Sequence, residues 1–486
     1  TKSKVISSLL WKLMERGGTQ GIQFIVQIVL ARLLLPKDFG IIAIVMVFIS
    51  LANVFVQSGL NTALIQKKDA DGKDFSSVLY LCLAIAGLLY VFIFFASPYI
   101  ANFYQEQQLV SILRVLSITL LLGAFNSIQN AYVAKHMLFK KLFFSSLGAV
   151  LISGTIGIVS AYMGLGLWAL VIQQIISQLT ISIILWFTVK WRPQLAFSKE
   201  KVKSLFSFGW KLLVSNLIHV LYIELRTLII GKAYNSSTLG YYNRGETFPK
   251  IIVSNIDGSI QSVMFPAFSA CQDNKQRVKE MVRRTVVTSS FLIFPAMIGL
   301  AVVAEPLIML LLTDKWIPAV PFLQLFCIAY AVLPIQNVNL QAISSMGRSD
   351  ITLKLQIIKK IVGLFILFVS IPFGVFAIAI GAVASAYFSM LINIYPNKKL
   401  LNYSYKEQFK DIFPSLLIAL VMGVIVHILS FITLETWLIL IIQIFSGIIV
   451  YIGLARFFRI ESLNYLINII KDIKYRKGID KQCIQR

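Results

Sequence analysis

Residues 76–98, with the sequence SSVLYLCLAIAGLLYVFIFFASP, contain no charged side chain. A helix rises 1.5 Å per residue, so a helix over this run is about 34 Å long and crosses the hydrocarbon core of a bilayer, which is about 30 Å thick. Similar runs recur along the 486 residues, of which 58% are hydrophobic and 14% are charged. This composition excludes a soluble globule, a disordered chain and a secreted disulfide scaffold, and the uninterrupted runs exclude the alternating strands of a membrane β-barrel. The sequence therefore predicts an all-α integral membrane protein.

Apolar runs separated by polar breaks predict about fourteen membrane-spanning helices. Their predicted ranges are 8–34, 41–64, 76–98, 110–134, 143–162, 165–189, 204–231, 246–270, 285–304, 320–345, 353–371, 375–396, 411–431 and 436–455. The first run continues past the short apolar region of a signal peptide and lacks a small-residue cleavage site, so we expect no cleavable signal peptide. The cysteines, Cys82, Cys271, Cys327 and Cys483, are scattered, which indicates neither a disulfide framework nor a metal site.

Positive charge alternates between the connections of these helices, and the net charge of the chain is +24. Every second connection is basic, and the residues are Lys67, Lys68 and Lys73; Lys135, Lys140 and Lys141; Lys190, Arg192, Lys199, Lys201 and Lys203; Lys275, Arg277, Lys279, Arg283 and Arg284; and Lys398, Lys399, Lys406 and Lys410. The connections between them carry only Lys37, Lys232, Arg244 and Lys315. Because cytoplasmic loops concentrate Lys and Arg, both termini are predicted to be cytoplasmic and the number of spans to be even. The basic tail could also be a nucleic-acid-binding arm, but we favour a tail at the lipid surface and expect no nucleic acid.

Short motifs recur in the same order at shifts of 199 to 208 residues. The pairs are Trp11-Lys12-Leu13 and Trp210-Lys211-Leu212, Gly40 and Gly240, Ile128-Gln129-Asn130 and Ile335-Gln336-Asn337, and Gly166-Leu167-Trp168-Ala169-Leu170 and Gly374-Val375-Phe376-Ala377-Ile378. An internal repeat of six spans is typical of transporters built from two parallel lobes. The predicted domains are an N-lobe (1–190), a cytoplasmic linker (191–203), a C-lobe of helices 7–12 (204–397), two further helices (398–460) and a basic cytoplasmic tail (461–486).

Polar side chains follow helical spacing inside four of the predicted spans. Arg16, Gln20, Gln23 and Gln27 are spaced i, i+4, i+7 and i+11, so they share one helix face. The other three stripes are Ser50, Asn53, Gln57 and Asn61; Lys211, Ser215, His219, Tyr222 and Arg226; and Glu246, Lys250, Asp257 and Gln261. Ionisable groups at membrane depth are costly and usually face a protein interior or a water-filled cavity. The stripes therefore predict a cavity between the lobes that accepts an anion.

Two interpretations of the stripes stay open. In the first, the stripes line the cavity, and the candidate substrate-binding residues are Arg16, Gln20, Gln23, Gln27, Asn53, Gln57, Lys211, His219, Tyr222, Arg226, Lys250 and Gln261. The candidate ion-coupling residues are Glu15, Glu224, Glu246 and Asp257. Alternatively, the amides bond to neighbouring helices, Glu15 and Glu224 are structural counter-ions of the cations, and His219, at a predicted depth similar to that of Asp257, is a packed side chain rather than a proton relay.

The segment from Glu15 to Gln66 resembles a known family through its loop LARLLLPKDFG at residues 30–40. With the second-lobe motif LGYYNR at residues 239–244, it is similar to the polysaccharide flippases of the multidrug/oligosaccharidyl-lipid/polysaccharide exporter superfamily, in their WzxC-like branch. The resemblance covers essentially the whole chain. It implies two six-helix lobes that enclose a central cavity, two extra C-terminal helices, and transport by alternating access.

The resemblance also implies a function without covalent chemistry. The implied substrate is an oligosaccharide on undecaprenyl pyrophosphate, which is moved across the bacterial cytoplasmic membrane for the export of a polysaccharide such as O-antigen. The implied partners are membrane lipids, a glycan polymerase and the export machinery. No cofactor is expected other than a coupling H+ or Na+, since the chain lacks a P-loop for ATP. The alternatives are an ion-coupled drug exporter, which the excess of cations disfavours, and a membrane polysaccharide polymerase, which the short outer connections disfavour.

Overall fold

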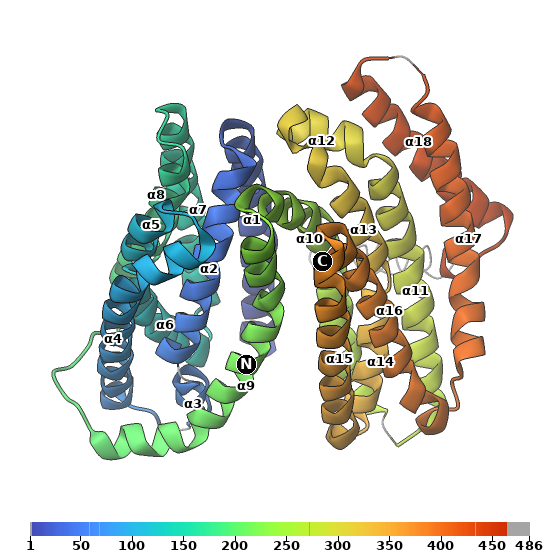
Figure 1. Ribbon diagram of the computed structural model, residues 1–486. Coiled ribbons are helices and arrows are strands. Elements are labelled where there is room, and N and C mark those ends of the chain that lie inside the picture. The colour runs from blue at the N-terminus through green and yellow to red at the C-terminus, as the bar shows by residue number, and fades with distance from the viewer. Residues whose placement is uncertain (1, 58, 68, 272, 433, 464–486) are drawn as a thin grey trace, which may run out of the picture. The chain divides into compact units, whose positions relative to one another are not determined.

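The computed structural model describes residues 2–463 apart from 58, 68, 272 and 433, and the side chains from residue 17 onward apart from those of 208 and 263 (Figure 1). Every regular element in this part of the chain is a helix, which confirms the predicted all-α fold. The first elements are α1 (Lys2–Leu33), α2 (Pro36–Gln57), α3 (Leu60–Gln66), α4 (Gly72–Tyr104), α5 (Gln108–Leu116), α6 (Thr119–Lys135), α7 (Phe139–Tyr162), α8 (Leu167–Thr188) and α9 (Lys199–Ala233). The others are α10 (Ser236–Ala270), α11 (Lys275–Val302), α12 (Ala304–Leu312), η1 (Asp314–Ala319), α13 (Val320–Ala331), α14 (Leu333–Ser345), α15 (Ser349–Ser370), η2 (Ile371–Phe373), α16 (Val375–Leu400), α17 (Tyr405–Leu429) and α18 (Thr436–Phe457).

Twelve helical segments of the described chain are long and apolar enough to cross a membrane. Each of them coincides with one of the predicted spans. The two remaining predicted spans correspond to α1 and α10, which are helices of 32 and 35 residues and carry two of the polar stripes. The protein is thus a multi-pass helical membrane protein, and the count of fourteen spans stays a prediction.

Three predicted spans are interrupted in the structure. The span predicted at 41–64 consists of α2 and α3. Gly59 lies between them with a φ of 67°, a left-handed conformation that interrupts a right-handed helix. The span at 110–134 consists of α5 and α6, and at the break the hydroxyls of Ser117 and Thr119 bond back to the carbonyls of Leu113 and Leu116, a bond that bends helices. The span at 320–345 is divided into α13 and α14 just before Pro334, whose nitrogen has no hydrogen to donate.

The chain divides into two compact units, residues 1–240 and 241–486. Unit 1 includes α9, which packs on α2, α3 and α4. The start of α9 is tied to α4 through the linker, where the amides of Gln194 and Ser198 donate to the hydroxyls of Ser76 and Ser77 at 2.9 and 3.0 Å. The contact division therefore does not coincide with the lobe boundary expected at 191–203, and the six-helix lobes stay a prediction.

Helix α9 is also held by an ion pair at its first turn. Lys201 Nζ lies 2.8 Å from Asp71 Oδ2 and 3.5 Å from Asp74 Oδ1. The hydrogen bond from Lys201 lowers the pKa of Asp71, and the same bond raises the pKa of Lys201. The carboxylate of Asp71 and the ammonium of Lys201 thus stabilise each other where the linker leads into α9.

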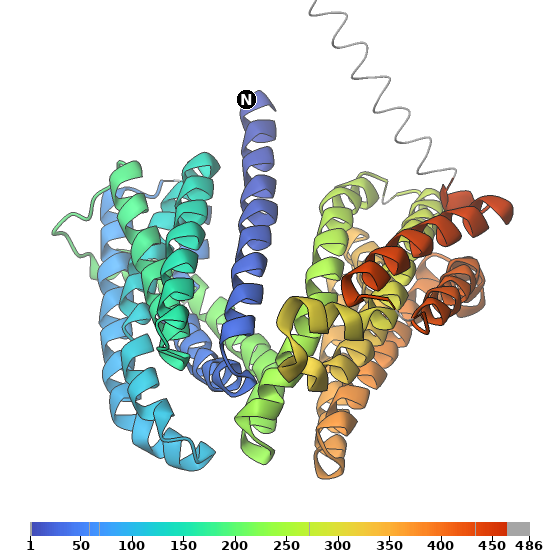
Figure 2. The same cartoon turned by 90° about the horizontal axis from the view of Figure 1, so that it is seen from above.

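Within unit 1, α1 packs along α7, and α7 along α8 (Figures 1 and 2). The start of α2 meets the start of α10 at two facing glycines. A β-carbon at Gly40 would collide with the carbonyl of Ser236, and a β-carbon at Gly240 would collide with the carbonyl of Pro36. Glu106 joins the same two helix starts, since its carboxylate lies 3.0 Å from Lys37 Nζ and accepts a hydrogen bond of 3.1 Å from Ser236 Oγ. Glycine is therefore required at both positions for the two helix starts to approach this closely.

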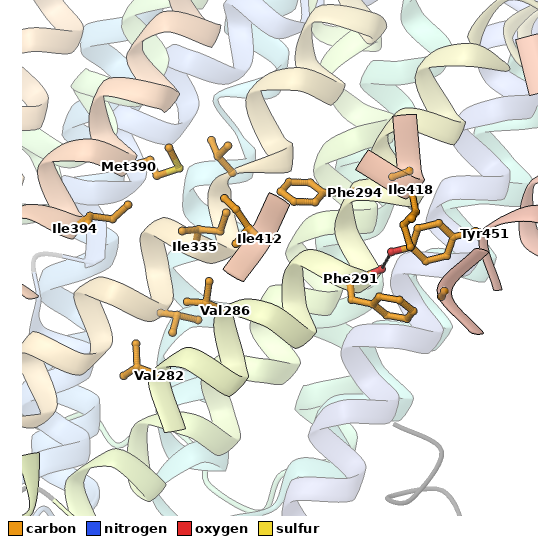
Figure 3. Packing of buried hydrophobic residues seen from close by; sticks show 14 of the residues in the cluster. Val282, Val286, Phe291, Phe294, Ile335, Met390, Ile394, Ile412, Ile418 and Tyr451 are labelled. Carbon is orange, nitrogen blue, oxygen red and sulfur yellow. Dashed lines mark hydrogen bonds between the residues drawn. The ribbon is translucent and has the colours of Figure 1, made fainter. Parts of the chain in front are cut away.

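Unit 2 has a continuous apolar core around α11, α14, α16, α17 and α18 (Figure 3). Val286, Phe294, Ile335 and Ile412 belong to it, and at its edge the buried hydroxyl of Tyr451 donates to the carbonyl of Phe291 at 2.8 Å. The two C-terminal helices, α17 and α18, lie side by side and contact α11 (Figure 2).

A buried amide network fastens α17 to the same core. Asn339 Nδ2 donates to Gln408 Oε1 at 3.0 Å, and Gln408 Nε2 and Asn397 Nδ2 donate to Asn339 Oδ1 at 3.0 and 2.8 Å. These amides come from α14, α17 and α16, so the bonds fix three helices against one another.

Candidate functional site

A cavity of about 540 Å³ lies inside unit 1, where α2, α3, α6, α8 and α9 meet. The polar residues that line it are Ser50, Asn53, Gln57, Asn61, Thr62, Thr119, Asn126, Ser127, Asn130, Gln174, Gln178 and Asn216. Its other lining residues are Met46, Ile49, Val54, Gly59, Leu116, Gly123, Ile181 and Val220. No lining residue is ionisable, so the cavity offers amide and hydroxyl groups that both donate and accept hydrogen bonds. We call it the unit 1 cavity.

One wall of the unit 1 cavity is held by a bonded group of α6 and α8 side chains. Asn126, which is only 4% exposed, donates from Nδ2 to Gln178 Oε1 at 2.9 Å and to the Gln178 carbonyl at 3.1 Å. Ser182 Oγ donates to Asn126 Oδ1 at 2.7 Å. The amide of Asn126 thus has a fixed orientation, which is what a preorganised binding wall requires.

Two glycines allow close approaches that position polar side chains at the cavity. A β-carbon at Gly123 would lie 3.2 Å from Asn53 Oδ1, so the bare backbone of α6 makes room for this amide. The left-handed Gly59 lies close to α9, where a β-carbon would be 2.5 Å from the carbonyl of Gly209. The turn at Gly59 starts α3 in a new direction and keeps Asn61 on the same cavity as Gln57.

The interior of this region contains polar atoms without a hydrogen-bond partner among the described residues. They include Oδ1 of Asn61 and of Asn130, both of which line the cavity, and both amide atoms of the neighbouring Gln129, which is fully buried. Buried polar atoms nearly always have a partner in folded proteins, so unpaired acceptors beside a cavity point to a polar occupant.

All four members of the stripe predicted on residues 50–61 line one cavity in the structure. Asn53 and Gln57 line the unit 1 cavity, as do Ser50 and Asn61 of the same stripe. Helix α9 lines it with Asn216 and Val220, one residue away from the predicted stripe.

The remaining candidates of unit 1 whose side chains are described do not line this cavity. Of the α9 stripe, Lys211 and His219 are exposed, and Tyr222, Glu224 and Arg226 are partly buried. Of the α1 stripe, Gln20 and Gln23 are exposed and Gln27 is partly buried. Glu15 and Arg16 lie outside the residues whose side chains are described.

In unit 2, the carboxylate of Asp257 is surrounded by amides. It is 5% exposed, and its Oδ2 accepts hydrogen bonds from Asn337 Nδ2 at 2.6 Å and from Gln261 Nε2. Gln341 Nε2 donates in turn to Gln261 Oε1 at 2.9 Å. The other carboxylate oxygen of Asp257, Oδ1, has no hydrogen-bond partner among the described residues. Asp257 and Gln261, both predicted site residues, are thus brought together with Asn337 from the repeated Ile-Gln-Asn motif.

The other two candidates on α10 differ from each other. Glu246 is partly buried, and its Oε1 accepts a hydrogen bond of 2.7 Å from the hydroxyl of Tyr330 on α13. Lys250, one turn further along α10, is exposed. The two carboxylates of α10 therefore have uncharged hydrogen-bond donors from α13 and α14.

Sequence reasoning missed several polar residues. Gln174 and Gln178 of α8 and Asn126 of α6 line the unit 1 cavity, and the visible signal was their position inside otherwise apolar runs. In unit 2, Lys359 and Lys360 occur near the middle of α15, where Lys359 is partly buried. A pair of lysines inside an apolar run carries the same signal, since charged residues at membrane depth usually have a function.

Comparisons with known proteins agree with the predicted resemblance. Residues 29–321 match the family described as polysaccharide biosynthesis protein. The chain is 29% identical over 307 residues to the teichuronic acid biosynthesis protein TuaB of Bacillus subtilis (strain 168), with 62% of each chain covered. It is 25% identical over 442 residues to the lipopolysaccharide biosynthesis protein WzxC of Escherichia coli (strain K12), with 87% of this chain and 88% of WzxC covered. The chain thus spans less than two thirds of TuaB and most of WzxC.

The fold is similar to that of a solved transporter. The lipid II flippase MurJ, in an inward closed conformation, superposes with a TM-score of 0.74 at 15% identity, with 93% of this chain and 99% of MurJ covered. At this identity the likeness concerns the fold alone, which is similar to that of MurJ. Because the matching region covers more than half of the chain, this protein belongs to the polysaccharide biosynthesis protein family.

Proposed function

We propose that this protein is a flippase that moves oligosaccharides linked to undecaprenyl pyrophosphate across the cytoplasmic membrane by alternating access, for the export of a polysaccharide. The observation that carries the proposal is the unit 1 cavity, an amide- and hydroxyl-lined space among apolar helices. Sugars present hydroxyl groups that donate and accept hydrogen bonds, which matches this lining. The names of TuaB and WzxC, from teichuronic acid and lipopolysaccharide biosynthesis, and the MurJ-type fold support the same function.

The three parts of such a substrate require different surroundings. The pyrophosphate is an anion that guanidinium and ammonium groups bind well, and Arg16, Lys211, Arg226 and Lys250 are the cations of the predicted stripes. The sugars are assigned to the unit 1 cavity, and the polyprenyl chain can remain in lipid. No bond of the substrate is made or broken in this process, so the proposed activity is transport rather than catalysis.

The energy source is proposed to be an ion gradient coupled through a carboxylate of α10. Asp257 is the preferred group, because it is buried and, among the described residues, its Oδ2 bonds to amides and its Oδ1 has no hydrogen-bond partner. Such a carboxylate can take up H+ or Na+ without the loss of an ion pair. Glu246 is the second candidate, since its described partner is the hydroxyl of Tyr330.

The orientation and the partners follow from the same proposal. We assign the termini and the basic connections to the cytoplasm, in accordance with the positive-inside rule. A glycan polymerase and export machinery are the proposed protein partners, since they would use the flipped substrate.

The proposal is tested by transport in proteoliposomes. A fluorescent undecaprenyl-pyrophosphate oligosaccharide is incorporated, and an impermeant quencher reports the leaflet in which it resides. We expect movement that depends on the protein, is lost in an Asn53→Ala/Asn126→Ala double variant, and is kept in Gln108→Ala, which removes an exposed amide outside the cavity. Folded protein that moves a small cationic solute but no lipid-linked sugar would replace the flippase proposal with a drug exporter.

A further inference from the structure

We infer that the unit 1 cavity is a saccharide subsite that takes an uncharged part of the glycan, such as a neutral hexose or N-acetylhexosamine, and rejects a sugar that carries a carboxylate. The inference rests on the proposed function and adds the class of sugar to it. The cavity volume of about 540 Å³ lies within the range of roughly 300–1,000 Å³ that is usual for sites of small ligands.

The first argument is that the cavity lining contains no charge. Its polar groups are amides and hydroxyls from five helices, and no lysine, arginine, histidine or carboxylate is among the lining residues. A carboxylate that enters such a space loses its water without gaining a counter-charge, which is far more costly than the transfer of a hydroxyl group that finds hydrogen-bond partners.

The second argument concerns the cations nearest to the lining residues in the sequence, which are Lys67, Arg114, Lys135 and Lys211. Arg114 Nε donates to the carbonyl of Phe94 at 3.2 Å and to Ser97 Oγ at 3.1 Å. Lys67 Nζ lies 2.9 Å from Asp74 Oδ1, and Lys135 Nζ donates to the carbonyl of Lys67 at 2.6 Å. Lys211 is exposed and does not line the cavity. Lys67, Arg114 and Lys135 would therefore lose existing contacts if they approached a sugar carboxylate in the cavity, and Lys211 is not among the lining residues.

The third argument is the match between donors and acceptors. The fixed amide of Asn126 has its Nδ2 and Oδ1 occupied by Gln178 and Ser182, so it supports the wall rather than binding a ligand itself. Asn53 and Gln57 line the same space, and their side chains make no hydrogen bond to another described residue. Each can donate and accept, which suits a hydroxyl or an acetamido group, whereas a carboxylate only accepts.

The test compares neutral and acidic sugars on the purified full chain in a detergent without a sugar headgroup. Ligand-observed NMR measures the binding of cellobiose, lactose and N,N′-diacetylchitobiose, and cellobiouronic acid is the acidic match of cellobiose. We expect at least one neutral disaccharide to bind roughly tenfold more tightly than cellobiouronic acid, a ratio that corresponds to about 1.4 kcal/mol. Equal or tighter binding of cellobiouronic acid, or no binding of any neutral disaccharide, would overturn the inference.

Two variants of matched size determine whether the cavity is responsible. Gln57 is exposed and lines the cavity, and its side chain makes no hydrogen bond to another described residue, so its replacement leaves the bonded wall intact. Gln57→Lys should reduce the preference for the neutral sugar, and Gln57→Glu should retain or increase it, with Gln108→Ala as the unchanged control. A preference that is the same in both Gln57 variants would place the selectivity elsewhere and overturn the inference.

The same variants in proteoliposomes separate this inference from the proposed function. The lipid-linked probes carry either a neutral disaccharide or its uronic-acid counterpart on the same polyprenyl pyrophosphate. Faster movement of the neutral probe supports both statements, and equal movement of the two probes contradicts the subsite. If selective binding is present but no probe changes leaflet, the flippase proposal is wrong while the subsite stands.

Discussion

Asn126 illustrates how a single side chain organises the candidate site. It lies on α6, is almost fully buried, and connects Gln178 and Ser182 of α8 through both ends of its amide. A buried amide with all its bonds made is rigid, whereas loss of one partner leaves the other groups unsatisfied. The shape of the cavity therefore depends on a residue that need not contact the substrate.

Replacement of Asn126 by Leu should destabilise unit 1 as well as impair transport. The substitution leaves Gln178 Oε1 without its donor and Ser182 Oγ with the Gln178 carbonyl alone, which is expected to cost about 1–3 kcal/mol. Thermal unfolding of the purified protein in detergent should show a lower apparent Tm. An unchanged Tm for Asn126→Leu, alongside a normal Gln108→Ala control, would contradict the structural role of this amide.

Asp257 is expected to set the ion dependence of transport. Asp257→Asn keeps an oxygen for the hydrogen bonds from Asn337 and Gln261, so the fold should be retained, while the group can no longer gain or lose a proton or neutralise a cation. Transport rates measured with and without a pH or sodium gradient should then become equal. The matched control is Asp350→Asn, which removes an exposed carboxylate paired with Arg348. Ion dependence that persists in Asp257→Asn excludes this residue as the coupling group.

At the scale of helices and loops, the facing glycines and the linker contacts explain why α9 belongs to unit 1. The starts of α2 and α10 touch through backbone at Gly40 and Gly240, and the other end of α9 is tied to the start of α4 by the Asp71–Lys201 pair. Both ends of the helix are thus fixed by local contacts that hydropathy does not reveal.

The facing glycines should not tolerate even a methyl group. Gly40→Ala and Gly240→Ala each place a β-carbon against a backbone carbonyl, so the start of α2 or of α10 must move. We expect a lower apparent Tm and reduced transport for both variants. Gly453→Ala on α18 meets no atom within 4 Å and should be neutral or slightly stabilising, since alanine favours helix. Equal stability of all three variants would argue against this close contact.

The Asp71–Lys201 pair should make the start of α9 sensitive to acid. The pKa of Asp71 is lowered in the folded protein, so its contribution is fully present above the unfolded value of about 3.9 and is lost as the pH falls below it. The raised pKa of Lys201 means that its contribution is present below about 10.4 and is lost at higher pH.

Amide hydrogen exchange over residues 199–205 measures this effect, after correction for the intrinsic pH dependence of exchange. Protection should be constant near neutral pH and decrease below about pH 4. The change should be small, because the pair is partly exposed to solvent. In Asp71→Asn, protection should already be reduced at neutral pH; an acid response identical to that of the original chain would assign the effect to another group.

At the scale of the whole molecule, hydropathy and charge were sufficient to predict the class of fold. Every predicted span coincides with helix because an apolar run of this length has few other stable forms in lipid. The breaks were missed where they depend on a single backbone angle at Gly59 or on hydroxyl groups that bond back to the helix at Ser117. Such local backbone conformations are set by the packing of the helices, which cannot be read from a single sequence.

The candidate site was predicted only in part, for a similar reason. The stripe with Asn53 and Gln57 was found since its members repeat at helical spacing, and both residues line the unit 1 cavity. Asn126 and Gln178 were missed because isolated amides in apolar helices resemble ordinary contacts between helices. Their assembly into one wall arises from the packing of α6 on α8, which periodicity within a single helix cannot indicate.

The predicted orientation of the whole chain can be checked directly. In a cysteine-free background, Leu35→Cys and Gln66→Cys place exposed thiols at opposite ends of α2 and α3. An impermeant maleimide added to intact cells should label position 35 and leave position 66 unlabelled until the cells are opened. The reverse pattern would invert the topology and with it the proposed direction of transport.

The facing glycines also bear on the evolution of a doubled chain. After a duplication, each copy can in principle accumulate substitutions without regard to the other. Here Gly40 of the first copy meets the backbone of the second, and Gly240 of the second meets the backbone of the first. A substitution in either predicted copy must therefore fit a backbone surface of the other copy. At this contact the two copies are expected to constrain each other's substitutions.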